Sequence, residues 1–314
     1  MDRKPIPPPS LELLLFPATD TEYVHFENAA SLPFDDGARY FSPVNAWWMA
    51  DAALLAYWDA PRAKPIWARA GLQFELLSEG GTQCHVAWSD RFVIVAFRGT
   101  QPNDVRDLFT DFQVEHADWE FGGGQVHSGF RAAHRQIWPL VEKRLNDLAS
   151  GRTVWFTGHS LGAALATLSM DRFENAAGLF TIGSPPVGDR RFARGFNHRH
   201  AGRNFRYVNH HDIIVWLPGM LAFLLGSYNH VQERKYINAQ GKHSGGLFFR
   251  DWSALVTALL TSRSLMRRLL EAPHETAPLL PLPGPLVDHT PRRYAIQVWN
   301  ALVDSAGVVV PARA

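Results

Sequence analysis

The sequence predicts an α/β fold in which a mainly parallel central sheet is flanked by helices. The chain has 314 residues, of which 46% are hydrophobic and 19% charged, as is typical of a globular protein with a large core. Between residues 131 and 209, segments with helix periodicity alternate with short apolar segments typical of strands. Such alternation indicates parallel strands joined by helices, with reactive groups gathered at the carboxyl ends of the strands.

The first third of the chain predicts a leader, a helix and three strands. Residues 1–40 are rich in proline, and we expect an irregular leader there. Apolar residues at helical spacing predict a helix over 45–58, which Pro61 and Pro65 would end. Three apolar segments should form strands with antiparallel pairing at one side of the sheet. They are 72–77, 82–88 and 91–97.

The rest of the chain predicts the parallel part of the sheet. The expected helices are 131–148 and 163–173, and the expected strands are 153–157, 179–182 and 205–209. We expect a single domain over 41–304, a segment inserted within it at 243–287, and a C-terminal tail over 305–314.

Composition excludes several classes of protein. The net charge of +1 gives no indication of nucleic-acid binding. The single cysteine, Cys84, excludes a framework of intrachain disulfides. The apolar run 13–16 is too short for a signal peptide, and no apolar stretch is long enough to span a bilayer. We therefore expect a cytoplasmic rather than a secreted protein, and the sequence leaves its oligomeric state open.

The most informative segment is Gly158-His159-Ser160-Leu161-Gly162. It follows the expected strand 153–157 and precedes the small residues that open the next helix. A strand, a G-x-S-x-G turn and a helix are the context of a nucleophile elbow, in which a serine occupies a strained turn between residues of little bulk. Ser160 is therefore the candidate nucleophile. The alternative is an inert serine in a glycine-rich turn.

A reactive serine needs a carboxylate that orients its base, and Asp212 is the best candidate. It follows the strand expected at 205–209, two strands from the elbow if the strand at 179–182 lies between them. Asp189 and Asp171 are alternatives, and each of the three could instead cap a helix or a turn. Asp171 is the weakest of them, because it would point away from the elbow.

For the base we favour His289, which lies late in the chain on a loop before a helical pattern. Other downstream histidines remain alternatives: His230, His243 and His274. His159 is too close to Ser160 in sequence to act as its base, and we expect it to pack. His210-His211-Asp212 could suggest a metal cluster, but no matching ligand spacing occurs elsewhere, so we expect no metal.

The oxyanion of an acyl-transfer reaction needs two donors. The backbone N–H of Leu161 follows the nucleophile, and Thr100 follows the strand expected at 91–97. Thr100 could donate through its backbone N–H and its hydroxyl.

Several blocks, taken together and in order, resemble the class 3, fungal-type lipase family. The matching blocks are Phe97-Arg98-Gly99-Thr100, Val126-His127-Ser128-Gly129-Phe130, Gly158 to Ala164, Gly183-Ser184-Pro185-Pro186-Val187-Gly188, Asp212 with Leu217-Pro218, and Asp288-His289 with Tyr294.

The resemblance implies an α/β-hydrolase fold with an inserted helical segment before the catalytic histidine. It implies that Ser160 is the nucleophile, Asp212 the acid and His289 the base, with Thr100 and Leu161 as oxyanion donors. It also implies hydrolysis of ester bonds in acylglycerols without a cofactor, so that the expected partners are a lipid ester substrate and, transiently, a lipid surface.

Two segments have open interpretations. The family's mobile lid corresponds to residues 102–112, with Val105, Leu108 and Phe109 as apolar positions, but an ordinary amphipathic helix would show the same pattern. The insertion at 243–287 combines helical apolar spacing with positive charge from Arg263, Arg267 and Arg268. It could dock on an anionic membrane or cover the substrate groove.

Rival functions also remain. The same machinery serves a phospholipase A1, a small-ester esterase, a peptidase or a thioesterase. A catalytically silent lipid-binding scaffold on a hydrolase fold is the alternative from another class.

Overall fold

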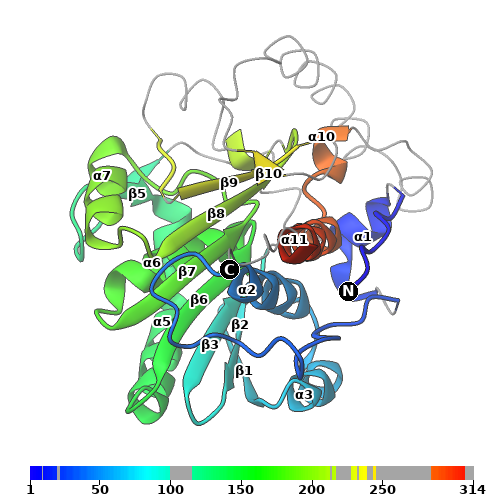
Figure 1. Cartoon of the computed structure of the whole chain (residues 1–314). Helices are drawn as coiled ribbons and strands as arrows, with labels where there is room; N and C mark the ends of the chain where they lie inside the picture. Colours follow the sequence, from blue (N-terminus) through cyan, green and yellow to red (C-terminus); the bar gives the residue numbers. More distant parts are fainter. Residues whose placement is uncertain are drawn as a thin grey trace, which may run out of the picture.

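The computed structural model describes residues 1–8, 10–19, 22–99, 115–212, 214–216, 228–231, 233–238, 243–244 and 284–307. A central sheet organises them, with its strands in the order β1-β2-β3-β6-β7-β8-β9-β10 (Figure 1). The bounds are β1 (Gln73–Glu79), β2 (Thr82–Trp88), β3 (Phe92–Phe97), β6 (Thr153–His159), β7 (Ala176–Ile182), β8 (Asn204–Asn209), β9 (Glu233–Ile237) and β10 (His243–Ser244). A separate ribbon pairs β4 (His116–Asp118) with β5 (Gln125–His127).

The strand directions confirm the predicted architecture. Strands β3, β6, β7, β8 and β9 pair in parallel, while β1, β2 and β3 form antiparallel pairs at one side. Strand β10 pairs antiparallel with β9, so the first residues of the expected insertion extend the sheet.

Helices cover both faces of the sheet. Figure 1 shows α2 (Pro43–Leu55) and α11 (Pro291–Gly307) on one face, with α5 (Ser128–Leu148) and α6 (Leu161–Arg172) on the other. The remaining helices are α1 (Leu11–Leu15), α3 (Ala60–Arg69), α7 (Arg190–Arg199) and α10 (Gly284–Val287), with one-turn 3₁₀ helices at η1 (Pro17–Thr19) and η2 (Ile214–Trp216). None of the helices in the described ranges is both long and apolar enough to cross a bilayer. Helix α11 continues over residues 305–307, which the sequence assigns to a tail.

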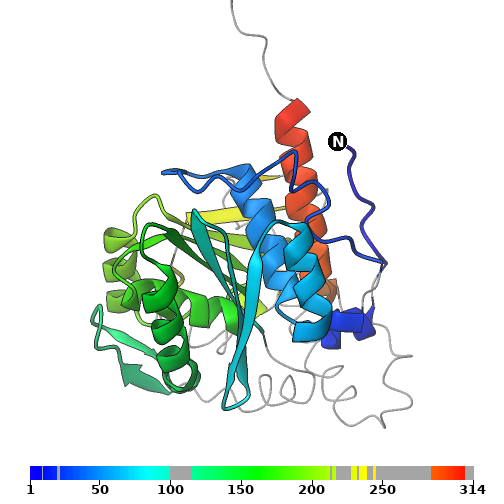
Figure 2. The same cartoon turned by 90° about the horizontal axis from the view of Figure 1, so that it is seen from below.

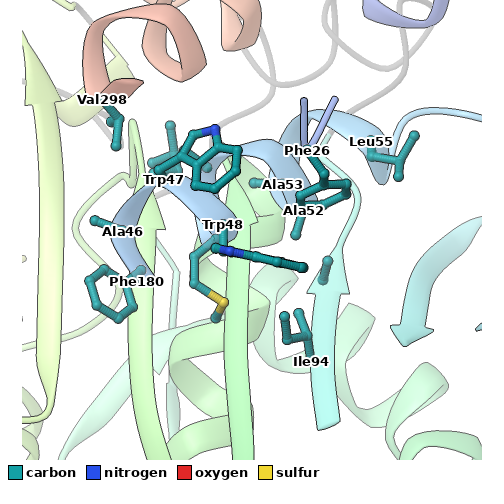
Figure 3. Packing of buried hydrophobic residues seen from close by; sticks show 14 of the residues in the cluster. Phe26, Ala46, Trp47, Trp48, Ala52, Ala53, Leu55, Ile94, Phe180 and Val298 are labelled. Atoms are coloured by element: carbon teal, nitrogen blue, oxygen red, sulfur yellow. The ribbon is translucent and has the colours of Figure 1, made fainter. Parts of the chain in front are cut away.

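Alternating side chains of the parallel strands build two cores. Trp155 of β6 packs in the cluster under α2 and α11, and its neighbour Phe156 packs in the cluster under α5 and α6. Successive residues of a strand point to opposite faces, so a strand buried on both faces is apolar at most positions. Figure 3 shows the first cluster, where Trp47 and Trp48 of α2 lie between the sheet and Val298 of α11.

The role predicted for the prolines after the first long helix is wrong. Helix α2 ends at Leu55, and Pro61 and Pro65 lie within the separate helix α3. Asp59 caps α3, because its carboxylate accepts a hydrogen bond from the backbone N–H of Arg62 at 3.1 Å. Proline is well suited to the first turn of a helix, where its missing N–H has no partner to lose, so Pro61 helps to begin this helix.

The proline-rich leader packs on the rest of the domain. Phe26 and Phe34 belong to the core under α2 and α11. Asp51 of α2 accepts hydrogen bonds from the Tyr23 hydroxyl at 2.5 Å and from the Phe26 N–H at 2.7 Å, and burial raises its pKa to about 6.

The beginning of the leader runs beside α11 (Figure 2). The backbone N–H and C=O of Lys4 bond to the side-chain amide of Asn300, at 2.7 and 2.9 Å. The indole N–H of Trp299 donates to the carbonyl of Asp2 at 2.9 Å. These bonds fix the N-terminal residues to the C-terminal helix.

The pH dependence of stability should depend on His134. Its ring lies between Trp119 and Trp138, and neither of its nitrogens has a hydrogen-bond partner among the residues described. Burial lowers its pKa from 6.5 to about 3. The unfolded chain therefore binds a proton that the folded chain excludes. The contribution of the neutral His134 to the stability of the fold is largest above pH 6.5 and falls as the pH drops towards 3.

We predict that His134→Phe reduces the difference in unfolding free energy between pH 7.5 and pH 5 by about 2 kcal/mol, measured by urea denaturation. His198→Gln, which changes an exposed histidine on α7, should leave that difference unchanged. An identical pH dependence in wild type and His134→Phe would contradict the prediction. Part of the dependence should remain in the variant, because burial also lowers the pKa of His25 to about 3 and of His85 to about 4.

Candidate active site

Ser160 occupies the turn between β6 and α6 in a strained backbone conformation. Its φ is 57° and its ψ is −125°, a region that a residue with a side chain rarely adopts. Its backbone N–H donates to the carbonyl of Ile182 at 3.0 Å, which ties the turn to the end of β7. The serine is 4% exposed. This is the geometry that the sequence predicts for a nucleophile elbow.

Gly158 shows why this turn needs residues of little bulk. A Cβ at this position would lie 2.3 Å from the carbonyl of Gly162, where the first turn of α6 crosses the end of β6. Only glycine permits so close an approach between a strand and the helix that follows it.

Asp212 and His289 lie together in the folded chain. Nδ1 of His289 is 2.8 Å from Oδ2 and 3.0 Å from Oδ1 of Asp212. An ionised carboxylate only accepts hydrogen bonds, so Nδ1 carries the proton and donates it, which leaves Nε2 as the acceptor. Asp212 is fully buried and His289 is 6% exposed, and a hydrogen bond to a carboxylate is stronger in such surroundings than in water.

Two further donors hold the Asp212 carboxylate. The hydroxyl of Tyr294, on α11, donates to Oδ2 at 2.6 Å, and the N–H of Ile214 donates to Oδ1 at 2.9 Å. Burial, and then the neighbouring Asp212, raises the pKa of Tyr294 well above its usual value, so the phenol stays protonated. Tyr294 also accepts a hydrogen bond from the Asn209 N–H at 2.8 Å, which fixes the end of β8 to α11.

The end of β7 brings the elbow and the Asp212–His289 pair to one place. Gly183, which follows the Ile182 that binds Ser160, has a φ of +57°. A Cβ there would lie 2.9 Å from Oδ2 of Asp212 and 3.1 Å from Nδ1 of His289. The imidazole of His289 also lies 4.4 Å, between ring centroids, from the ring of His159, the residue directly before Ser160.

His159 packs at the site and also forms hydrogen bonds that the sequence did not indicate. Its Nε2 is 2.8 Å from the carbonyl of His289, and its Nδ1 is 2.8 Å from the hydroxyl of Tyr57. Burial, and then the neighbouring His289, lowers the pKa of His159 well below 6.5. The neutral ring therefore donates from Nε2 to the backbone of His289 and accepts from Tyr57 at Nδ1.

The rival aspartates take structural positions. Asp189 caps α7 by accepting from the Phe192 N–H at 2.7 Å. Asp171 lies near the C-terminal end of α6, away from the elbow. Its carboxylate accepts a hydrogen bond from the Trp119 indole at 2.8 Å and lies 2.7 Å from the Arg199 guanidinium. The rival His230 bonds to the carbonyl of Val215 at 2.7 Å.

Of the other predicted site residues, Leu161 is the first residue of α6, so its N–H has no preceding helical carbonyl to bind. Several predicted residues lie outside the described ranges: Thr100, the lid positions Val105, Leu108 and Phe109, His274 and most of the insertion at 243–287.

Comparison with known proteins gives a consistent result. Residues 94–222 match the family model described as lipase (class 3). A Caenorhabditis elegans lipase is 31% identical over 140 residues, which cover 42% of this chain and 39% of that protein. A secreted mono- and diacylglycerol lipase of Malassezia restricta is 32% identical over 164 residues, covering 46% of this chain and 52% of that protein. The matched segments thus cover only about half or less of the length of each of these curated relatives.

Among solved structures, a lipase from Rhizopus microsporus var. chinensis superposes with a TM-score of 0.50 at 25% identity, covering 67% of this chain and 80% of that one. The fold is the α/β-hydrolase fold. The resemblance of this chain to the class 3 lipase family is confirmed, and the matched segment contains both Ser160 and Asp212. His289 lies beyond that segment, and its place beside Asp212 comes from the structure.

We predict that Tyr294→Phe slows the labelling of Ser160 by a fluorophosphonate by about tenfold or more, because it removes one donor from a buried carboxylate. Tyr23→Phe is the matched control, since it removes a similar tyrosine–aspartate hydrogen bond, at Asp51, away from the site. The control should lose stability without losing its labelling rate. Equal labelling rates in Tyr294→Phe and wild type would show that Tyr294 does not support the pair.

Proposed function

We propose that the protein hydrolyses carboxylic ester bonds of lipids, with Ser160 as nucleophile, His289 as base and Asp212 as acid. The observation that carries this proposal is the hydrogen bond from Nδ1 of His289 to the buried Asp212 carboxylate, at 2.8 Å, beside the strained turn that bears Ser160. A serine, a histidine and an aspartate in these roles form the acyl-transfer triad of serine hydrolases.

In the proposed reaction, Nε2 of His289 takes the proton of the Ser160 hydroxyl as Oγ attacks the ester carbonyl. Asp212 holds the imidazole by Nδ1 and stabilises the imidazolium that forms. The imidazolium then protonates the leaving alcohol, and an acyl-serine remains. Water, deprotonated by the same histidine, attacks the acyl-serine and releases the fatty acid.

The oxyanion of the tetrahedral intermediate would be held by the Leu161 N–H and by Thr100. The position of Leu161 in the first turn of α6 supports its part, because such N–H groups point out of the helix end and favour negative charge. One donor of this kind lowers the barrier by about 3 kcal/mol.

For the second donor, we predict that Thr100→Ala lowers kcat on a soluble ester without changing the thermal unfolding temperature. Thr100→Ser, which retains a hydroxyl, should restore most of the rate. A wild-type kcat in Thr100→Ala would show that the Thr100 hydroxyl is not an oxyanion donor.

The substrate class is proposed from the names of the relatives. They include mono- and diacylglycerol lipases of fungi and a triacylglycerol lipase of Arabidopsis thaliana. Acylglycerols form aggregates in water, so an enzyme acting on them would make transient contact with a lipid surface. Phospholipids and small soluble esters are the alternative substrates on the same machinery.

We predict that wild-type protein hydrolyses a series of p-nitrophenyl esters from acetate to palmitate, and that Ser160→Ala reduces kcat by about four orders of magnitude or more. Ser169→Ala, which removes a buried hydroxyl further along α6, should retain activity. A diacylglycerol and phosphatidylcholine, assayed in parallel, separate an acylglycerol lipase from a phospholipase A1. Wild-type rates in Ser160→Ala would contradict the mechanism, and an unlabelled Ser160 in the fluorophosphonate assay would favour a silent scaffold.

A further inference from the structure

A second group of polar side chains lies next to the Asp212–His289 pair and has no part in the proposed reaction. It consists of His210, His211 and Asp288, and one ligand atom from each lies within 4.8 Å of the other two. Nδ1 of His210 is 3.1 Å from Oδ2 of Asp288, and the backbone N–H of His211 donates to the same oxygen at 3.2 Å. The two histidines follow β8, whereas Asp288 follows α10.

The backbone at His210 brings the two imidazoles together. In extended chain, successive side chains point to opposite sides. His210 has a φ of 39°, in the left-handed region, which interrupts that alternation. The ring centroids of His210 and His211 are consequently 3.7 Å apart, so two neighbouring imidazoles lie near one carboxylate.

Hydrogen bonds that use none of the ligand atoms hold the two segments in place. The side-chain amide of Asn209 donates to the backbone carbonyl of Asp288 at 3.0 Å. The backbone N–H of Asn209 donates to Tyr294 on α11 at 2.8 Å. Positions fixed in this way reduce the cost of assembling ligands around an ion.

The donor types select the class of ion. Two imidazoles and one carboxylate suit zinc and copper, whereas calcium and magnesium favour oxygen ligands. Ligands bound to zinc at about 2.0–2.1 Å in tetrahedral geometry lie about 3.3 Å from one another. The 3.1 Å separation of Nδ1 of His210 and Oδ2 of Asp288 is already close to that value, and the ligand atom of His211, within 4.8 Å of both, would have to move closer.

The cluster is also accessible and is partly balanced in charge. The side chain of His210 is 28% exposed and that of Asp288 is 11% exposed, so an ion has a route from solvent. The Arg293 guanidinium lies 3.8 Å from Oδ1 of Asp288, on the other oxygen from the one that faces the histidines. Oδ2 therefore remains directed at the His210 imidazole and the backbone N–H of His211.

We propose that His210, His211 and Asp288 bind one divalent transition-metal ion, with zinc as the reference ion, and that its binding slows hydrolysis at the neighbouring triad. The first part stands on the cluster alone, and the second rests on the proposed function. An ion on Oδ2 would replace the hydrogen bond from the His211 N–H. Asp288 directly precedes His289, so rearranging it would disturb the position of the base.

Calorimetric titration with zinc chloride tests the binding site without any assay of activity. Wild type should bind one ion per chain, and His210→Asn and His211→Gln should each weaken binding by about tenfold or more. Asparagine is chosen at 210 because it tolerates the left-handed backbone. His198→Gln, at an exposed histidine on α7, should bind zinc as wild type does. Circular dichroism verifies that each variant is folded.

Equal zinc binding in wild type, His210→Asn and His211→Gln would overturn the site, as would the absence of binding in wild type.

For regulation, ester hydrolysis by wild type should fall as zinc is added and recover with EDTA. Both variants should hydrolyse at the wild-type rate without zinc and resist inhibition. Equal inhibition of all variants, or binding without any change in rate, would overturn the regulatory part. If no ester is hydrolysed, the calorimetry still decides whether the ion site exists.

Discussion

The candidate site depends on keeping one carboxylate charged inside the protein. Asp212 is fully buried, and an isolated buried carboxylate would be strongly disfavoured. His289, Tyr294 and Ile214 each donate to it. These donors come from a loop, from α11 and from η2, so the charge is stabilised only when distant parts of the chain have assembled. The same requirement that orients His289 therefore organises this end of the sheet.

The cores on the two faces of the sheet fix the positions of the strand and the helix that build the site. Trp155 and Phe156, neighbours on β6, pack in different clusters, so the strand that carries Ser160 is fixed from both faces. Helix α11 packs against α2 in the first of these clusters, with Trp47 and Trp299 rings 5.3 Å apart. Tyr294 on α11 is thus held by the core at one side and reaches Asp212 at the other.

The choice of Asp212 and His289 among several carboxylates and histidines rests on the resemblance to the lipase family. Local sequence patterns predict six strands of the central sheet and the elbow, because these depend on periodicity or on a turn with a strong residue preference, but they do not indicate β4, β5, β9 or β10. They fail at Pro61 and Pro65, because proline can begin a helix as well as end one, and the capping role of Asp59 decides between the two. The Tyr57–His159–His289 contacts could not be predicted either. Nothing in the neighbourhood of Tyr57 indicates that it meets a residue 102 positions away.

Helix α7 and the cluster at Asp288 were missed for different reasons. Arginine-rich α7 is short and has few apolar positions, although Phe192 and Phe196 lie at helical spacing and Asp189 provides a capping signal. For the cluster, the sequence draws attention to Asp212, the immediate neighbour of the two histidines. In the fold, His210 instead contacts Asp288, 78 residues away in sequence, and Asp212 bonds to His289.

The order of assembly has a consequence for a chain made from its N-terminus. Ser160, its strand and its helix are adjacent in sequence and can fold early, whereas His289 and Tyr294 are synthesised after every strand of the described sheet. Lys4 and Asn300 bind each other, so the segment around Lys4 can be fixed only after α11 has formed. If Ser160, His289 and Asp212 act as proposed, a nascent chain carries its serine in an unactivated form until α11 has emerged, however well its sheet has formed.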